Sequence, residues 1–542
     1  MTSFSVTIGS ANATAVLDNP AADFAAKFCA AAELNHLARC SGRPLDHAAL
    51  DSLVAVLLSR RFAGQRQRLF LYREAADTLA RTAVRWKAAP PGIEALARLG
   101  RALMVVDGYA HRAVSEALGA LPVQVAGPQA PPAGHQACPV AHWPALLAAG
   151  RLRTAGPPAW KGRSLIVPVT DGLLVLKFAR PGQDSTAGLQ AERWWMEHLA
   201  GQRYRFRVPF AVPRPLGCLK VAGLPWRPPA GFETEITRPA LAYLAHPDYF
   251  SYPNTGPAGP GFAAMQRSLE HSAWLLGYLA GQGVIHTSPI ALFHNRVQRR
   301  RRRDQGRYEW FRAGRLDRWL ESCRYPNLAL CGLRDLEHLE SIAGPGLQLY
   351  RHLGAHLLSL LLVAASWFRN RRPELAGRDG RGRPVDARRL FDRDLLEKVV
   401  REIFRRYHEG FTGLEYRGRL PFDAGHLAAR MVEEMGVDRH MEEVLRVADQ
   451  NRMTSGQLED FLVGRGYGRQ EAAAIKKGAA DIVIISGPHL GGFNRPISLP
   501  EMIQAVAAAA AVCIAGRFRA EGGLPAGMDL ADVPVSPAAG NG

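Results

Sequence analysis

An apolar segment that ends in a lysine is followed by a segment of helical periodicity with one inward glutamate. Lys177 lies near the end of the run Leu173–Phe178, and Glu192 comes 15 residues later. Glu192 falls on the same helical stripe as Leu189 and Met196, because residues three and four apart share a helix face. A carboxylate on an apolar stripe needs a cation, since a buried unpaired charge is costly. We therefore expect Lys177 and Glu192 to form an ion pair.

A later apolar segment delivers two more carboxylates. The run 328–333 leads to Asp335-Leu336-Glu337. Carboxylate oxygens are the ligands that Mg²⁺ prefers, and two carboxylates two residues apart could hold one or two ions beside a phosphate. Asp335 is therefore the strongest single candidate for a metal ligand, with Glu337 as a second. The alternative is an Asp and a Glu that are simply solvated at the end of a strand.

A third segment lies between these two. Residues 283–295 read Gly-Val-Ile-His-Thr-Ser-Pro-Ile-Ala-Leu-Phe-His-Asn and contain His286 and Asn295. In this order, the lysine strand, the glutamate helix, the His loop and the Asp-Leu-Glu segment resemble the protein-kinase superfamily over about residues 160–420. Asp-Leu-Glu is more similar to the Asp-Phe-Glu form of small-molecule kinases of the choline and aminoglycoside type. The resemblance implies a bilobal domain that binds ATP and Mg²⁺.

The resemblance also implies a role for each residue. Lys177 would bind the nucleotide phosphates, and Glu192 would orient the lysine. His286 would belong to the catalytic loop. Asn295 would close that loop and bind the metal and the nucleotide together with Asp335.

Several positions depart from the kinase pattern. Ser288 stands where the catalytic Asp belongs, and a hydroxyl is too weak a base at pH 7 to replace a carboxylate. Phe293 stands where the loop Asn belongs, so the equivalence of Asn295 requires a shifted or bulged loop. No Gly-x-Gly-x-x-Gly precedes Lys177, so the phosphates must be covered in another way. A kinase-like site that lacks its base is similar to the pseudokinases.

Two pseudokinases with activity suggest what such a site can do: SelO transfers AMP, and SidJ adenylates a carboxylate for glutamylation. The loop 283–288 is also similar to that of SelO. Adenylyl transfer to a carboxylate needs no base, because the nucleophile is already an anion. The resemblance therefore implies adenylyl transfer or ATP-dependent ligation, with a protein or another carboxylate compound as acceptor. Phosphorylation of a small molecule and a non-catalytic ATP-binding scaffold are the alternatives.

A second family shares two fragments of the sequence. Leu333-Arg334-Asp335 and His294-Asn295 resemble the Leu-Arg-Asp and His-x-x-Asn elements of siderophore synthetases, which condense carboxylates with amines through acyl-adenylates. The N-terminal nucleotide motifs of that family are not recognisable here. The pseudokinase interpretation therefore ranks first.

The elements that must position these residues make an α+β protein. The expected order is a helical domain (1–125), a Pro- and Gly-rich linker (126–160), a small kinase-like lobe (161–255), a large lobe (256–420), a helical extension (421–528) and a disordered tail (529–542). Two strand-like runs around the Asp-Gly pair at 171–172 predict a hairpin in the small lobe. The large lobe and the extension have mostly helical periodicity.

The N-terminal domain contains two similar segments. Arg73 and Arg112 are 39 residues apart, as are Leu79 and Leu118, and this spacing fits a HEAT-like helical repeat. An irregular bundle of Ala-rich helices explains the same pattern. Either arrangement predicts an interaction or support module, and as an interaction module it would bind a protein.

Two further segments have two interpretations each. Arg299–Arg303 could contact nucleic acid or another acidic partner, or form a solvated loop. Because no aromatic residues interleave the arginines and no zinc-finger spacing is present, nucleic acid is not the expected partner. Tyr249, Phe250 and Tyr252 follow the small lobe, where the two lobes of a kinase connect. They either wall an adenine site or pack in the core.

Composition limits the classes of protein. The chain has 542 residues, with 68 Lys and Arg against 49 Asp and Glu, and its net charge of +19 favours anionic ligands without choosing among them. A 47% hydrophobic content excludes wholesale disorder, and seven Cys without a CxxC pair argue against disulfides and Cys-based zinc. No secretory signal is recognisable, and the apolar runs at 357–368 and 505–515 are shorter than the roughly 20 residues that span a bilayer. We expect a cytoplasmic protein without a membrane span.

Overall fold

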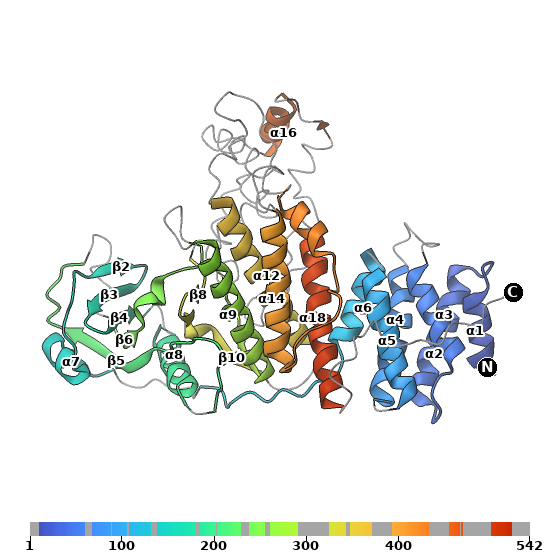
Figure 1. Ribbon diagram of the computed structural model, residues 1–542, viewed down its shortest axis with the longest axis horizontal. Helices are drawn as coiled ribbons and strands as arrows, with labels where there is room; N and C mark the ends of the chain where they lie inside the picture. Colours follow the sequence, from blue (N-terminus) through green and yellow to red (C-terminus); the bar gives the residue numbers. More distant parts are fainter. Residues whose placement is uncertain are drawn as a thin grey trace.

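The computed structural model shows an α+β protein in which a large helical lobe lies between a module of N-terminal helices and a small sheet (Figure 1). The structure describes residues 10–59, 68–87, 89–105, 108–131, 138–179, 185–201, 203–228, 238–254, 261–290, 323, 325–342, 347–370, 393–432, 455–464, 466, 468, 469 and 500–522. The tail expected at 529–542 lies outside these residues.

The described part of the N-terminal module is a set of packed helices. They are α1 (Ser10–Asp18), α2 (Phe24–Cys40), α3 (His47–Leu58), α4 (Arg68–Arg85), α5 (Pro90–Val105) and α6 (Gly108–Gly119). Asp23 and Asp46 cap the starts of α2 and α3, each by accepting a hydrogen bond from a backbone N–H three residues further on. The two similar segments fall in α4 and α6, where Arg73 and Arg112 both pair with Glu116. These two helices therefore lie side by side.

The small lobe is built on a six-stranded mixed sheet with the strand order β1-β5-β6-β4-β3-β2. The strands are β1 (Val140–His142), β2 (Ala159–Lys161), β3 (Ser164–Val169), β4 (Gly172–Phe178), β5 (Arg214–Ala222) and β6 (Ala240–Ala245). β3 and β4 form the hairpin expected at the Asp-Gly turn, and β1 runs parallel to β5 while the other neighbours are antiparallel. Helix α8 (Ser185–Leu199) packs against β5 and β6.

The linker expected at 126–160 is wrong in its extent, because part of this segment is folded. β1, α7 (Trp143–Gly150) and most of β2 fall inside it, and β1 and β2 form the two edges of the sheet. Trp143 and Leu146 of α7 pack with Leu165 and Val167 in a hydrophobic cluster separate from the main core. Strands of three residues are too short to show a hydrophobic period, so the sequence pattern could not reveal them.

The large lobe is a group of long helices. They are α9 (Phe262–Gly281), α12 (Leu347–Asn370), α14 (Arg393–Thr412) and α18 (Pro500–Glu521), and the short α16 (Ser455–Gly464) stands apart from them (Figure 1). α9 and α14 touch through glycines, since a Cβ at Gly277 would lie 2.3 Å from the Tyr407 carbonyl oxygen and one at Gly410 would lie 2.2 Å from that of Trp274. Within the helical extension expected at 421–528, α18 packs against α12, α14 and α6. α18 thereby joins the lobe to the N-terminal module.

Among the described residues, two helices are long and apolar enough to cross a membrane by length and composition alone. They are Leu349–Phe368 within α12 and Glu501–Glu521 within α18. Inside the protein, 94% and 67% of their most apolar windows are buried, and the core helix of a soluble protein meets the same criterion.

Short elements at the junction of the two lobes carry the candidate site. They are η1 (Pro247–Phe250), β7 (Val284–His286), β8 (Leu328–Ala329), β9 (Gly332–Leu333), η4 (Leu336–His338) and β10 (Leu339–Ser341). β7 pairs with β10, which places Leu339 opposite His286, and β8 pairs with β9. These pairings bring the His loop next to the Asp-Leu-Glu segment.

Candidate functional site

Lys177 lies inside β4 and reaches toward α8. Its backbone is fixed on both sides, because it pairs with Ser164 of β3 and with Leu241 of β6. Its Nζ atom lies 2.8 Å from Oε2 of Glu192, whose side chain is completely buried. The ion pair therefore joins α8 to the centre of the sheet.

Asp335 stands just before η4 in the left-handed backbone conformation, with φ 52° and ψ 53°. This conformation is uncommon for a residue other than glycine, Asp and Asn tolerate it better than most, and such strain concentrates at functional sites. The Asp335 carboxylate contacts Nζ of Lys177. Lys177 thus joins Glu192 of α8 to Asp335, which lies 158 residues after the lysine in the chain.

Glu337 faces the same cluster and is held by an arginine that the sequence analysis missed. Arg163 lies in the turn between β2 and β3, and its Nη2 is 2.6 Å from both carboxylate oxygens of Glu337. Nζ of Lys177 is 3.7 Å from the same carboxylate. Gly162, with φ 54°, gives this turn its left-handed step. The turn before β3 therefore places the positive charge of Arg163 beside the carboxylate cluster, although no glycine-rich loop precedes Lys177.

Three carboxylates and two cations share this buried cluster: Glu192, Asp335, Glu337, Lys177 and Arg163. Burial acts to lower the pKa of Lys177, but the three carboxylates outweigh it and raise that pKa. Burial acts to raise the pKa of Asp335 and Glu337, yet the nearby Lys177 holds both below their usual range. Burial and the two other carboxylates raise the pKa of Glu192 in spite of Lys177. When all five groups are ionised, the cluster carries one net negative charge, which favours a nearby cation.

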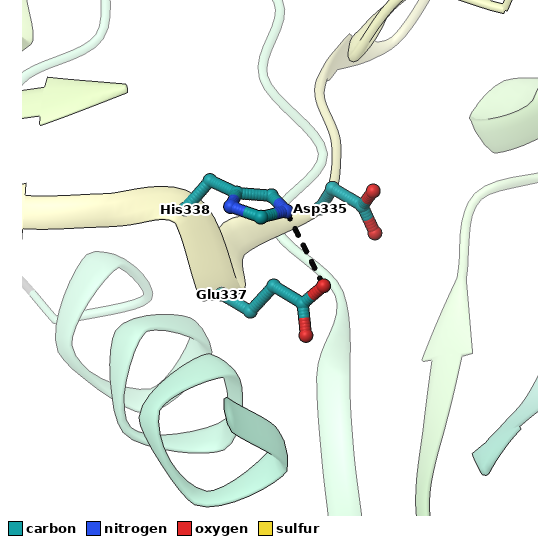
Figure 2. A group of neighbouring side chains, drawn as sticks. All are labelled: Asp335, Glu337 and His338. Atoms are coloured by element: carbon teal, nitrogen blue, oxygen red, sulfur yellow. Dashed lines mark ion pairs between the residues drawn. The ribbon is translucent and has the colours of Figure 1, made fainter. Parts of the chain in front are cut away.

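Among the described residues, Asp335, Glu337 and His338 form a group that could hold a metal ion (Figure 2). One ligand atom from each lies within 4.8 Å of the others, and Nε2 of His338 is 3.3 Å from Oε1 of Glu337. The two carboxylates fit Mg²⁺, whereas an imidazole suits zinc or iron better. The Mg²⁺ assignment therefore depends on the two carboxylates, and His338 is a third candidate ligand that the sequence analysis did not name.

A chain of hydrogen bonds fixes the loop after β7. Nε2 of His286 donates to the Arg334 carbonyl at 2.9 Å, and Nδ1 accepts from the Ser288 N–H at 3.2 Å. Behind it, Nε2 of His356 donates to the His286 carbonyl and Nδ1 accepts from the Tyr407 hydroxyl, both at 2.9 Å. Burial lowers the pKa of His286 to about 4 and that of His356 to about 3. Both imidazoles are neutral at pH 7, and the hydrogen bond from His286 to the Arg334 carbonyl helps to position the Asp-Leu-Glu segment.

Two of the candidate features, Asn295 and Arg299–Arg303, lie outside the described residues. A different asparagine lies against the His loop in the structure. Asn327 is buried, its Nδ2 donates to the Ser288 carbonyl at 2.8 Å, and its own carbonyl accepts from the Arg334 N–H at 3.0 Å. It directly precedes β8, and a polar residue just before an apolar pair is the signal that could have marked it as a candidate.

The arrangement brings a paired lysine, an arginine and two carboxylates that could hold a metal ion to one point between the sheet and the long helices. Cations bind phosphate oxygens, and carboxylates hold the divalent ion that accompanies a triphosphate. A comparison of the chain with protein-family models and with curated proteins finds no match. The geometry and charge of the site are therefore what a functional assignment can use.

Proposed function

We propose that this protein is a pseudokinase-type enzyme that binds ATP with Mg²⁺ and transfers the adenylyl group to a carboxylate, either as a modification or as the first step of a ligation. The observation that carries the proposal is the contact of Lys177 with both Glu192 and Asp335. Kinase-like proteins use a strand lysine, a helix glutamate and a late aspartate to bind nucleotide phosphates and metal. A small sheet followed by a helical lobe supports the bilobal form of that fold.

Each side chain of the cluster has a distinct role in this proposal. Lys177 and Arg163 provide the positive charge that neutralises the phosphates, and Glu192 fixes the direction of Lys177. Asp335 and Glu337 would hold Mg²⁺, which supplies positive charge to the phosphate oxygens when it is bound. Arg163 takes the position of the absent glycine-rich loop.

The missing base favours a carboxylate over a hydroxyl as the acceptor. Ser288 occupies the base position, and its hydroxyl is buried and directed to the Ile290 carbonyl at 3.5 Å. In the proposed step, a carboxylate oxygen of the acceptor attacks the α-phosphorus, the bond from that phosphorus to the bridging oxygen breaks, and pyrophosphate leaves. No proton has to be removed from the acceptor, so the absence of a base does not prevent the reaction.

The experiment that tests this function follows the label from two forms of ATP. The protein is incubated with Mg²⁺, a mixture of dicarboxylates and amino acids, and ATP that is labelled at either the α- or the γ-phosphate. We expect α-label in the protein or in an acceptor and a parallel release of pyrophosphate. Label from the γ-position would assign phosphoryl transfer instead, and bound ATP without any transfer would assign a non-catalytic scaffold.

Two variants make the labelling result specific to the site. Asp335→Asn keeps the shape of the side chain and removes its charge, so we expect it to abolish transfer. Asp248→Asn in η1 is the matched control, because the side chain of Asp248 is 51% exposed and lies outside the cluster. Equal loss of label in both variants would contradict the assignment of Asp335.

A further inference from the structure

An aromatic wall lies beside the candidate site, at the connection between the lobes. Tyr249 and Phe250 belong to η1, which follows β6 directly, and Tyr252 comes two residues after η1. The rings of Tyr249 and Phe250 meet edge to face with centroids 5.2 Å apart. Tyr249 and Tyr252 are buried, so the wall is a fixed part of the lobe junction.

Two cations from opposite lobes lie on these rings. The guanidinium carbon of Arg334 is 5.2 Å from the ring centre of Tyr249, 4.5 Å from that of Phe250 and 4.8 Å from that of Tyr252. Nζ of Lys161, at the end of β2, is 4.9 Å from the ring centre of Phe250 and 5.7 Å from that of Tyr252. The small lobe and the large lobe therefore each place one positive charge on the same two rings.

These two cations have no carboxylate partner of the kind that Lys177 has. Within the described part of the chain, neither Lys161 nor Arg334 forms an ion pair, and the buried Nε of Arg334 has no hydrogen-bond partner. Partial burial and the nearby Arg334 both lower the pKa of Lys161, as expected for two like charges that lie close together. Asp335, the acid next in sequence to Arg334, is in contact with Lys177 instead. Among the described residues, no acid therefore compensates the positive charge at the wall.

We propose that Lys161 and Arg334 form an oxyanion-binding site on this aromatic wall. A guanidinium presents parallel N–H donors that match the two oxygens of a carboxylate or phosphate, and a lysine adds a point charge from the other side. Like-charged side chains that share rings and lack an acid are stabilised by such a ligand. An uncharged base would leave the repulsion between the two cations in place, so the wall suits an anionic group better than adenine.

The position of this site suggests which substrate carries the oxyanion. Arg334 is adjacent in sequence to Asp335, so the wall lies next to the cluster that would bind the nucleotide phosphates. If the proposed function holds, on which this step depends, the oxyanion is the carboxylate of the acceptor. The same chemistry would also bind a phosphate group of the nucleotide, and a binding experiment can separate the two sources.

The test is isothermal titration of the full chain, without Mg²⁺, with glutarate as the carboxylate probe and tripolyphosphate as the phosphate probe. Lys161→Gln and Arg334→Gln are compared with the wild type, and Lys220→Gln is the matched control, because Lys220 is an exposed lysine in the same sheet. We expect the Kd of at least one probe to rise about tenfold in Lys161→Gln and more in Arg334→Gln, because a charge-assisted contact is lost. In the control variant the Kd should not change. Since Lys161 is exposed, its substitution is not expected to disturb folding.

The outcomes separate the site from the proposed function. Weaker glutarate binding with unchanged ATP–Mg²⁺ affinity in Lys161→Gln assigns the site to the acceptor, whereas weaker binding of tripolyphosphate and ATP assigns it to the nucleotide. If the wild type binds a probe but not ATP, and the variants bind that probe more weakly, the oxyanion site is supported and the proposed function is contradicted. Wild-type protein that binds neither probe, or variants that bind both probes as the wild type does, would overturn the inference.

Discussion

Replacement of Lys177 by methionine removes the cation that Glu192 and Asp335 share. Methionine fits the same strand position in length and apolar character, so the main loss is the charge. Glu192 is completely buried, and its nearest cation, 2.8 Å away, would be gone. Removal of one partner of a buried ion pair costs about 3–5 kcal/mol, because the other charge stays behind without compensation. We therefore expect Lys177→Met to lose about that much free energy of unfolding.

A second substitution shows whether the cost comes from the stranded carboxylate. Glu192→Gln in the Lys177→Met background removes the uncompensated charge while it keeps the shape of the side chain. The double variant should therefore recover about 2–4 kcal/mol of the loss, which is far from the sum of the two single effects. Such recovery would measure the coupling between the strand and α8 directly.

The stability of Lys177→Met should also depend on pH. The pKa of Glu192 is already raised by burial, and loss of Lys177 raises it further. A carboxyl group whose pKa is higher in the folded state than in the unfolded state binds its proton more tightly when folded, so stability falls as the pH rises above the ordinary pKa of about 4.3. Lys177→Met should therefore be less destabilised near pH 5 than near pH 8.

The assay is urea unfolding followed by tryptophan fluorescence, with Lys220→Met of β5 as the control. Lys220 is exposed in the same sheet, and its variant should unfold like the wild type. Strictly additive effects of Lys177→Met and Glu192→Gln, or a Lys177→Met protein as stable as the control, would refute the buried ion pair as an organising contact of the small lobe.

Three further predictions follow from the contacts described. Arg163→Gln should raise the Kd for ATP–Mg²⁺ about tenfold in a calorimetric titration, because a charge-assisted phosphate contact is lost. The control Arg153→Gln changes an exposed arginine and should leave the Kd unchanged. Equal affinities of the two variants would remove Arg163 from the site. Burial depresses the folded-state pKa of His286 to about 4, so His286 should contribute up to about 3 kcal/mol of stability that is complete above pH 6.5 and is lost as the pH falls through about 4. In urea unfolding, the stability of His286→Gln should therefore fall less steeply with decreasing pH than that of the wild type. An unchanged slope would contradict this prediction. Gly277→Ala should lose about 1–3 kcal/mol of unfolding free energy in the same assay, because its Cβ would lie 2.3 Å from a carbonyl oxygen of α14. Gly464→Ala is the control and should lose none, because a Cβ there meets open space. The reverse order would disprove the close contact of α9 with α14.

The parts of the site that sequence could reveal are those with a local signal. Lys177 and Glu192 were recognisable because an apolar strand and an apolar helical stripe each contained one charge of opposite sign. Asp335 and Glu337 were recognisable as a short acidic motif after an apolar run. Their convergence at one point depends on the pairing of β7 with β10 and on the left-handed turn at Asp335, which no local pattern specifies.

The residues that sequence could not reveal are defined by distant partners. Arg163 lies in a turn after a strand of three residues, and its partner Glu337 is 174 residues away. Asn327 meets the His loop only because the chain returns after a long intervening segment, so no local pattern near His286 indicates it. β1 and α7 were placed in a linker for a related reason, since the parallel pairing of β1 with β5 joins segments about 80 residues apart.

The aromatic segment shows how a sequence pattern can suggest the right place and leave its chemistry open. Tyr249, Phe250 and Tyr252 were expected either to wall an adenine site or to pack in the core. The structure adds Lys161 and Arg334 to the rings, and both come from elements that the motif itself does not include. The charge at this wall is therefore a tertiary property, and it changes the ligand that we expect there.

The central claim is that the cluster of Lys177, Glu192 and Asp335 binds the triphosphate of ATP together with its divalent ion. The most direct measurement is calorimetric titration of ATP into the full chain with Mg²⁺ and again with excess chelator. We predict one ATP per chain with Mg²⁺, an affinity at least about tenfold weaker under chelation, and a similar weakening in Asp335→Asn. A wild-type chain that releases no heat with ATP–Mg²⁺, or an Asp335→Asn variant that binds it as tightly as the wild type, would contradict the claim.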